Sequence, residues 1–138
     1  MKRRDFLEKT GYGAAGIVAA PLAQGAEKNK ELVVRSYDFE VEVVENGPKT
    51  RCHMVGEKFK WPEESGKLCT WLTSALDPFV TALDAGGTLT WKYSGTPYEK
   101  VIDPDGVTTE FIRCPDPSEA GIVVKITRTF KSKRTIEV

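Results

Sequence analysis

Three cysteines and one histidine carry most of the chemistry available in this chain of 138 residues. Cys52 and His53 are adjacent, whereas Cys69 and Cys114 lie far along the sequence from them and from each other. Three thiolates and an imidazole form a ligand set that suits zinc or iron. The chain has no C-x-x-C pair, however, and adjacent strand residues point to opposite faces of a sheet. Cys52 and His53 can therefore share an ion only if they lie on a turn.

The same cysteines allow other interpretations. A disulfide between Cys52 and Cys69 closes a loop of about 18 residues, which stabilises a fold by about 3 kcal/mol through loop entropy. In the alternative, all three thiols are reduced and structural, with Cys114 buried as a small apolar residue. Reactive-thiol chemistry is a further alternative. Asp116, two residues after Cys114, is a candidate for orienting a ligand beside that thiol.

Aromatic residues form a second candidate group. One interpretation of Trp61, Trp71, Trp91, Tyr93 and Tyr98 is that they line an apolar or sugar-binding cleft, but in a domain this small the default expectation is that they fill the core. The run Asp103-Pro104-Asp105-Gly106 resembles the start of a calcium loop but lacks its ligand spacing. It therefore predicts a turn.

The overall charge excludes some classes of partner. The chain has 20 basic and 20 acidic residues, so its net charge is zero. This balance argues against nucleic acid as a partner and against attachment to an anionic membrane surface. No segment offers the roughly 20 uninterrupted apolar residues of a spanning helix, so we expect no membrane span once an export signal is removed.

The first 26 residues have the layout of an export signal. A basic opening is followed by a Gly/Ala-rich run from Gly11 to Ala23 and then by small residues. The pair Arg3-Arg4 followed by Phe6-Leu7 resembles the twin-arginine signal, whose arginines are read by a receptor. The resemblance implies export of a folded protein to the periplasm or another extracytoplasmic space, with the twin-arginine translocation machinery as a partner.

The remaining chain predicts one α+β domain. We expect a flexible leader over 27–36, a domain over 37–131 and a basic tail over 132–138. Alternating apolar residues predict strands over 37–43, around 59–61, over 88–93 and 108–114, and over 122–131, with 101–102 pairing beside 108–114. Apolar residues at helical spacing predict a helix over 67–85, divided at Asp77-Pro78 and ended by Gly86-Gly87. This order predicts a mainly antiparallel sheet with one helix, or a broken helix pair, on one face.

A spaced set of short motifs runs through this domain: Cys52, Val55-Gly56-Glu57-Lys58-Phe59, Leu68-Cys69 and Cys114-Pro115-Asp116. The set resembles a family of small uncharacterised bacterial proteins with the layout C…V-G-[D/E]-x-F…L-C…C-P-D. The resemblance covers most of residues 35–130. In that family a histidine follows the first cysteine by a few residues, whereas here the two are adjacent. The resemblance implies a domain of this size and no particular activity.

These observations predict an exported, non-catalytic domain that binds a ligand or serves as an accessory subunit of a larger exported protein, and that needs no cofactor. The alternative is a metal- or thiol-dependent redox protein that uses Cys52, Cys69 and Cys114, with zinc or iron as the metal.

Overall fold

A computed structural model describes residues 30–138, so the predicted signal with Arg3, Arg4, Phe6 and Leu7 lies outside the described residues. Residues 33–136 form one compact unit. At the ends of the described chain, the backbone N–H of Val138 donates a hydrogen bond to the carbonyl of Lys30 at 3.0 Å. Within residues 30–138, no helix has the length and apolarity needed to cross a membrane.

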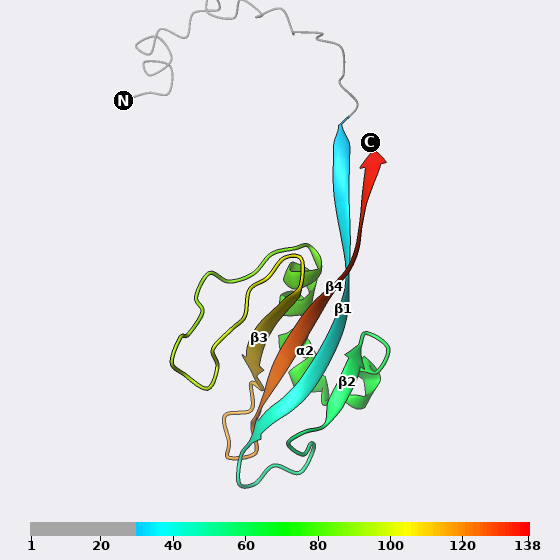
Figure 1. The fold of residues 1–138 in the computed structure, drawn as a ribbon. Coiled ribbons are helices and arrows are strands. Elements are labelled where there is room, and N and C mark those ends of the chain that lie inside the picture. The colour runs from blue at the N-terminus through cyan, green and yellow to red at the C-terminus, as the bar shows by residue number, and fades with distance from the viewer. Residues whose placement is uncertain (1–29) are drawn as a thin grey trace, which may run out of the picture. The chain divides into compact units, whose positions relative to one another are not determined.

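The fold is α+β, as predicted. In the part of the chain that the structure describes, four antiparallel strands form one sheet in the order β2-β1-β4-β3, and one α-helix packs on one face (Figure 1). The elements in chain order are β1 (Glu31–Asn46), β2 (Lys58–Trp61), the short 3-10 turn η2 (Ser65–Lys67), α2 (Thr70–Asp84), β3 (Val107–Arg113) and β4 (Ile122–Glu137).

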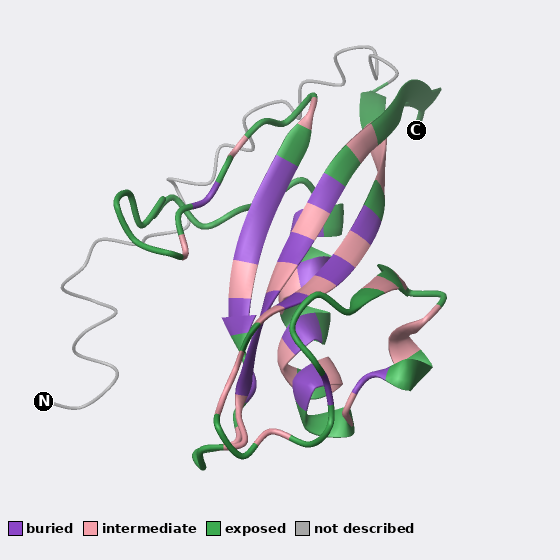
Figure 2. Cartoon of the chain, turned by 60° about the horizontal axis from the view of Figure 1, so that its bottom comes forward, coloured by how far each residue is buried: buried purple, intermediate pink, exposed green. Residues whose placement is uncertain are grey.

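Alternation along the strands places the core between sheet and helix. In β1, Phe39, Val41 and Val43 are buried, while the residues between them are half-exposed (Figure 2). Because β1 pairs with β2 in the register Val41↔Phe59 and Glu42↔Lys58, apolar side chains share one face and charged side chains share the other. The helix contributes Leu72, Leu76, Val80 and Leu83 to the same core.

The prediction of a divided helix is wrong, because α2 continues through Pro78. An interior proline costs a helix about 3 kcal/mol. The buried residues Leu72, Leu76 and Val80 lie on both sides of it and contribute about 1.5–3 kcal/mol each by burial. Pro78 itself is exposed, so the carbonyl that loses its partner is on the solvent side. The free energy gained by burying this continuous apolar face of α2 therefore outweighs the cost of the interior proline.

The structure confirms the predicted end of the helix but not its predicted start. The start is three residues later than predicted, since 65–67 form the separate turn η2 and α2 begins at Thr70. The end agrees with the prediction: Gly86 has φ +85° and Gly87 donates its backbone N–H to the carbonyl of Ala82 at 2.9 Å. A residue in the left-handed conformation followed by this long-range bond is a Schellman cap, which favours glycine.

The strand predicted over 88–93 is absent, and residues 88–106 form an irregular segment beside β3 (Figure 1). The free edge of β3 is occupied by Val101, whose carbonyl accepts a hydrogen bond from the N–H of Thr109 at 2.9 Å. This contact agrees with the predicted pairing of 101–102, and it leaves no edge there for a further strand. Tyr93 also has φ 51°, which no strand accommodates.

The strands predicted at 37–43 and 122–131 are too short, because β1 is longer at both ends and β4 at its C-terminal end. β1 begins at Glu31, inside the segment expected as a leader, and β4 continues to Glu137, through the segment expected as a tail. The residues over 131–137 are exposed, so the sequence shows no inward-facing apolar alternation there. Backbone pairing needs no such alternation, which is why the pattern underestimates both strands.

Candidate functional site

An apolar cleft of about 250 Å³ lies between the 88–106 segment, α2 and the edge of the sheet. We call it the aromatic cleft. Its walls are Phe79, Leu89, Tyr93, Tyr98, Glu110, Phe111, Arg113 and Val123. A second hollow of about 360 Å³ shares Phe79, Leu89 and Glu110 with it, so the two adjoin along the end of α2. Most of the wall surface is apolar, as is usual for small-molecule sites.

A buried ion pair fixes the segment that forms the outer wall. Lys100 Nζ lies 2.8 Å from Glu110 Oε2, and their side chains are 0% and 5% exposed. Glu110 also accepts the backbone N–H of Phe111 at 3.1 Å, and the ammonium of Lys100 lies 5.1 Å from the ring centroid of Tyr93. Removing one partner of such a pair costs about 3–5 kcal/mol, because the other charge stays buried without compensation. The cleft is therefore preorganised.

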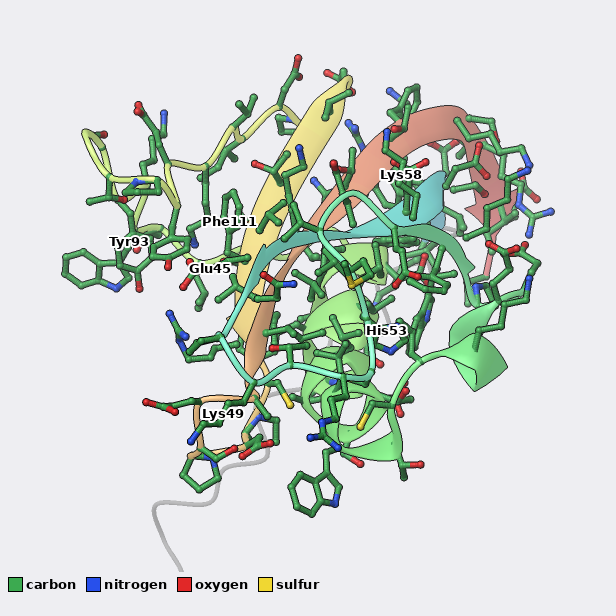
Figure 3. The ribbon with its side chains drawn as sticks, turned by 90° about the horizontal axis from the view of Figure 1, so that it is seen from below. Glu45, Lys49, His53, Lys58, Tyr93 and Phe111 are labelled. Atoms are coloured by element: carbon green, nitrogen blue, oxygen red, sulfur yellow. The ribbon has the colours of Figure 1, made fainter. Side chains whose placement is uncertain are left out.

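Polar groups lie at one end of the cleft. The hydroxyl of Tyr98 donates to the carboxylate of Glu45 and accepts from Arg113 Nη2 at 3.2 Å. The hydrogen bond to Glu45 raises the pKa of Tyr98 above its ordinary value. The ring of Tyr98 packs edge-on against Phe111 with centroids 5.7 Å apart. Figure 3 shows Glu45, Tyr93 and Phe111 on the side of the sheet where these contacts form.

A separate cavity of about 510 Å³ brings together residues that the sequence analysis singled out. Its lining includes Cys52, Cys69, Cys114 and Asp116. We call it the cysteine cavity. The three thiols come from the 47–57 loop, the start of α2 and the end of β3, and no disulfide joins them. Cys52 is exposed, Cys69 is half-buried and Cys114 is buried.

His53 does not line this cavity and is held by both ring nitrogens. Its Nε2 accepts the backbone N–H of Cys69 at 3.3 Å, and its Nδ1 lies 3.2 Å from Glu57 Oε2. Because Nε2 accepts, Nδ1 carries the proton and donates to Glu57. The ring also packs edge-on against Phe59, with centroids 5.4 Å apart. His53 thus ties the 47–57 loop, where it is labelled in Figure 3, to the start of α2.

The predicted ligand set of three cysteines and His53 is not assembled. Among residues 30–138, no group of three histidine, cysteine or acidic side chains is arranged to hold a metal ion. Asp116 lines the cysteine cavity but is partly engaged, because Ser118 donates its backbone N–H to Asp116 Oδ1 at 2.8 Å. Hydrogen bonds from Ser118, its side chain first and its backbone second, lower the pKa of Asp116.

The five predicted aromatic residues are divided between different places. Tyr93 and Tyr98 line the aromatic cleft, Trp71 lines the cysteine cavity, and Trp61 packs against the core. Trp91 is 71% exposed on the 88–106 segment. The predicted turn at 103–106 is present, with Asp105 donating its backbone N–H to Asp103 Oδ1 at 3.0 Å.

Sequence reasoning missed the buried charges. Arg128 is 2% exposed and donates to the carbonyl of Leu83 at 2.8 Å and to Thr108 Oγ1 at 3.1 Å. The signal was present, because Arg128 continues the alternation of Ile122, Val124 and Ile126. Lys100 and Glu110 also gave a signal: they are opposite charges on the two sides of the 103–106 turn, where hairpin residues face each other.

Comparison with protein-family models, with curated proteins and with solved structures finds no match to this chain.

Proposed function

We propose that this protein is an exported, non-catalytic ligand-binding domain, and that its binding site is the aromatic cleft. The ligand is a small molecule with a planar apolar ring and one anionic group. The observation that carries this proposal is an apolar cleft whose outer wall is held in place by the fully buried Lys100–Glu110 pair. A wall fixed before binding reduces the entropy lost when a ligand is ordered.

The size and walls of the cleft support a small ring. Its volume of about 250 Å³ is below the range of about 300–1,000 Å³ typical for drug-sized ligands. Phe79, Tyr98 and Phe111 offer aromatic surface, which prefers offset or edge-on contact with another ring. A ligand of about ten non-hydrogen atoms in such a cleft binds with a Kd on the order of 0.1–1 mM.

Arg113 supports an anionic group on the ligand. Its side chain is 60% exposed and lies 3.7 Å from Glu45, a longer contact than the bidentate pair that a guanidinium forms with a free carboxylate. A ligand carboxylate at this end of the cleft can accept hydrogen bonds from the guanidinium N–H groups of Arg113 that Tyr98 and Glu45 do not use.

Export is supported by the sequence of residues 1–26 alone, with Arg3 and Arg4 as the residues that a translocation receptor reads. A binding domain outside the cytoplasmic membrane captures ligand there, either for itself or for a larger exported partner.

Isothermal titration of the full-length protein with indole-3-acetate and with indole tests the site. We expect indole-3-acetate to bind more tightly, and Arg113→Gln to abolish the difference between the two probes. Leu89→Gln, which changes a wall residue that both hollows share, should weaken indole-3-acetate binding by about fivefold, or about 1 kcal/mol.

Met54→Gln is the matched control, because Met54 is another large exposed side chain (66%) and does not line the cleft. Equal weakening by Leu89→Gln and Met54→Gln, or no heat of binding for either probe at millimolar concentration, would overturn the proposed site.

A further inference from the structure

We propose that the cysteine cavity is a thiol–disulfide exchange site for a small disulfide that carries carboxylate groups. Cys52 is the attacking thiol and Cys69 is the resolving thiol. This inference is independent of the aromatic cleft, with which the cavity shares no residue.

The first observation is that the three cysteines lie around one cavity. The only three cysteines of the chain lie in three different parts of the sequence, yet all three line one cavity of about 510 Å³. If these cysteines served only as small core residues, nothing would bring them to a common solvent-accessible hollow. A shared hollow is what exchange requires, because each transfer needs the next thiol within reach of the bond just formed.

The exposures assign the roles. Attack on an external disulfide needs an accessible sulfur, and Cys52 is the exposed cysteine of the three. Cys69 is half-buried, and its backbone lies near Cys52, because its N–H donates at 3.3 Å to the ring of His53, the residue next to Cys52. Cys114 is 8% exposed, too enclosed to meet a disulfide from solvent.

The charges around the cavity favour a carboxylate-bearing disulfide. Lys49 and Arg51 line it together with the carboxylate of Asp116. Lys49 pairs with Glu119 at 3.0 Å, whereas Arg51 forms no ion pair with any residue of 30–138 and is the cation left for a ligand. Cys69 is the N-cap of α2 and makes no side-chain capping bond, so the positive end of the helix also faces this region. Arg51 and the helix end both attract anionic groups. Trp71, 60% exposed at the rim, offers an apolar surface to the rest of the molecule.

The exchange has two steps. The thiolate of Cys52 attacks one sulfur of a disulfide RS–SR, so that a Cys52–S–S–R bond forms, the original S–S bond breaks, and RS⁻ leaves and takes a proton from water. The thiolate of Cys69 then attacks the sulfur of Cys52, forming a Cys52–Cys69 bond and releasing the second RS⁻. Two protein thiols are oxidised to one disulfide, and one external disulfide is reduced to two thiols.

The test uses the full-length reduced protein and oxidised glutathione as the probe, with intact mass and peptide mapping as the readout. We expect the unmodified sequence to form a Cys52–Cys69 disulfide and to leave Cys114 free. Cys69→Ser should trap one glutathione on Cys52, whereas Cys52→Ser should form neither product over the same time. Cys114→Ala is the matched control and should behave as the unmodified sequence does.

A second comparison tests recognition of the carboxylates. Arg51→Gln should slow the reaction with oxidised glutathione by about threefold, as expected for loss of one exposed charge contact. It should leave the reaction with neutral hydroxyethyl disulfide unchanged. Equal slowing with both probes would overturn the assigned substrate class.

Three results would overturn the exchange site itself. One is modification of Cys114 in preference to Cys52. Another is absence of the trapped adduct in Cys69→Ser protein that has the circular dichroism spectrum of the unmodified sequence. The third is protection of all three thiols from iodoacetamide by one equivalent of zinc, which would assign the cavity to metal binding.

Discussion

At the scale of single residues, buried charge distinguishes this molecule. Lys100 and Glu110 are enclosed together, and their pair joins an irregular segment to the edge strand of the sheet. Lys67 and Glu64 form an exposed pair at a nearly equal distance of 3.0 Å. Comparing the two pairs therefore shows how much burial, rather than charge alone, changes the contribution of an ion pair to the free energy of unfolding.

We expect Lys100→Met to lower the free energy of unfolding by about 3–5 kcal/mol, because Glu110 is then left buried and unpaired. Lys67→Met should change it by less than about 1 kcal/mol, as for exposed pairs in general. Urea denaturation measures both. The double change Lys100→Met with Glu110→Leu should recover much of the loss. If Lys100→Met were no worse than Lys67→Met, the pair would not hold the cleft.

Tyr98 gives a pH-dependent prediction. Its hydrogen bond to Glu45 raises the pKa of the phenol above the ordinary value of 10.0. A raised pKa in the folded state means that the stabilisation is fully present below pH 10 and is lost as the pH rises through the higher folded value. We expect Tyr98→Phe to reduce stability at neutral pH and to remove, from an absorbance titration, a phenol that ionises above pH 10. An unchanged titration curve at high pH would contradict the Tyr98–Glu45 contact.

At the scale of elements, α2 shows packing overriding a local signal. Pro78 lies inside the helix, where it removes a backbone hydrogen bond on the exposed side. We expect Pro78→Ala to raise the free energy of unfolding by about 1–2 kcal/mol. The recovered helix hydrogen bond and the higher helix propensity of alanine stabilise the folded state. The greater conformational entropy of the unfolded chain without proline offsets part of this gain. Ser74→Ala, at an exposed position of the same helix, is the control and should change little. Thermal denaturation compares the two, and a destabilised Pro78→Ala protein would show that the helix requires a proline there.

The elements also show what a sequence can predict. The strand around Val41, the strand around Ile126 and the cap at Gly86 were predictable, because alternation and a left-handed glycine are local signals. Residues 88–93 were predicted as a strand because they alternate as well. Their irregular path depends on which segment occupies the edge of β3, and no local pattern contains that information.

The candidate sites, too, were predictable only as far as local sequence signals reach. The sequence identified Cys52, Cys69 and Cys114 as reactive types, but their common cavity depends on how the 47–57 loop packs against α2. Tyr93 and Tyr98 were among five aromatic residues for which a cleft was the alternative to the core, whereas Phe79 and Phe111 join them only through the tertiary fold. Spacing along the chain predicts which residues can act, and long-range packing decides which of them meet.

At the scale of the whole molecule, a proposed export signal precedes a folded domain. Residues 1–26 are proposed to direct export, and residues 33–136 carry both cavities. We expect replacement of Arg3 and Arg4 together by lysine to retain the protein in the cytoplasm, because the receptor reads the guanidinium pair and not charge alone. Cell fractionation with a C-terminal tag measures this. Lys9→Arg is the control and should be exported normally, and export of the double-lysine variant would contradict the assignment.

The location of the ligand is the most direct test of the proposed function. Two-dimensional amide NMR of the labelled full-length protein, titrated with indole-3-acetate, reports every backbone site at once. We predict saturable shifts centred on Leu89, Tyr93, Tyr98 and Phe111, with little change near Trp61, which packs against the core. Shifts centred elsewhere, or none at millimolar probe, would contradict binding in the aromatic cleft.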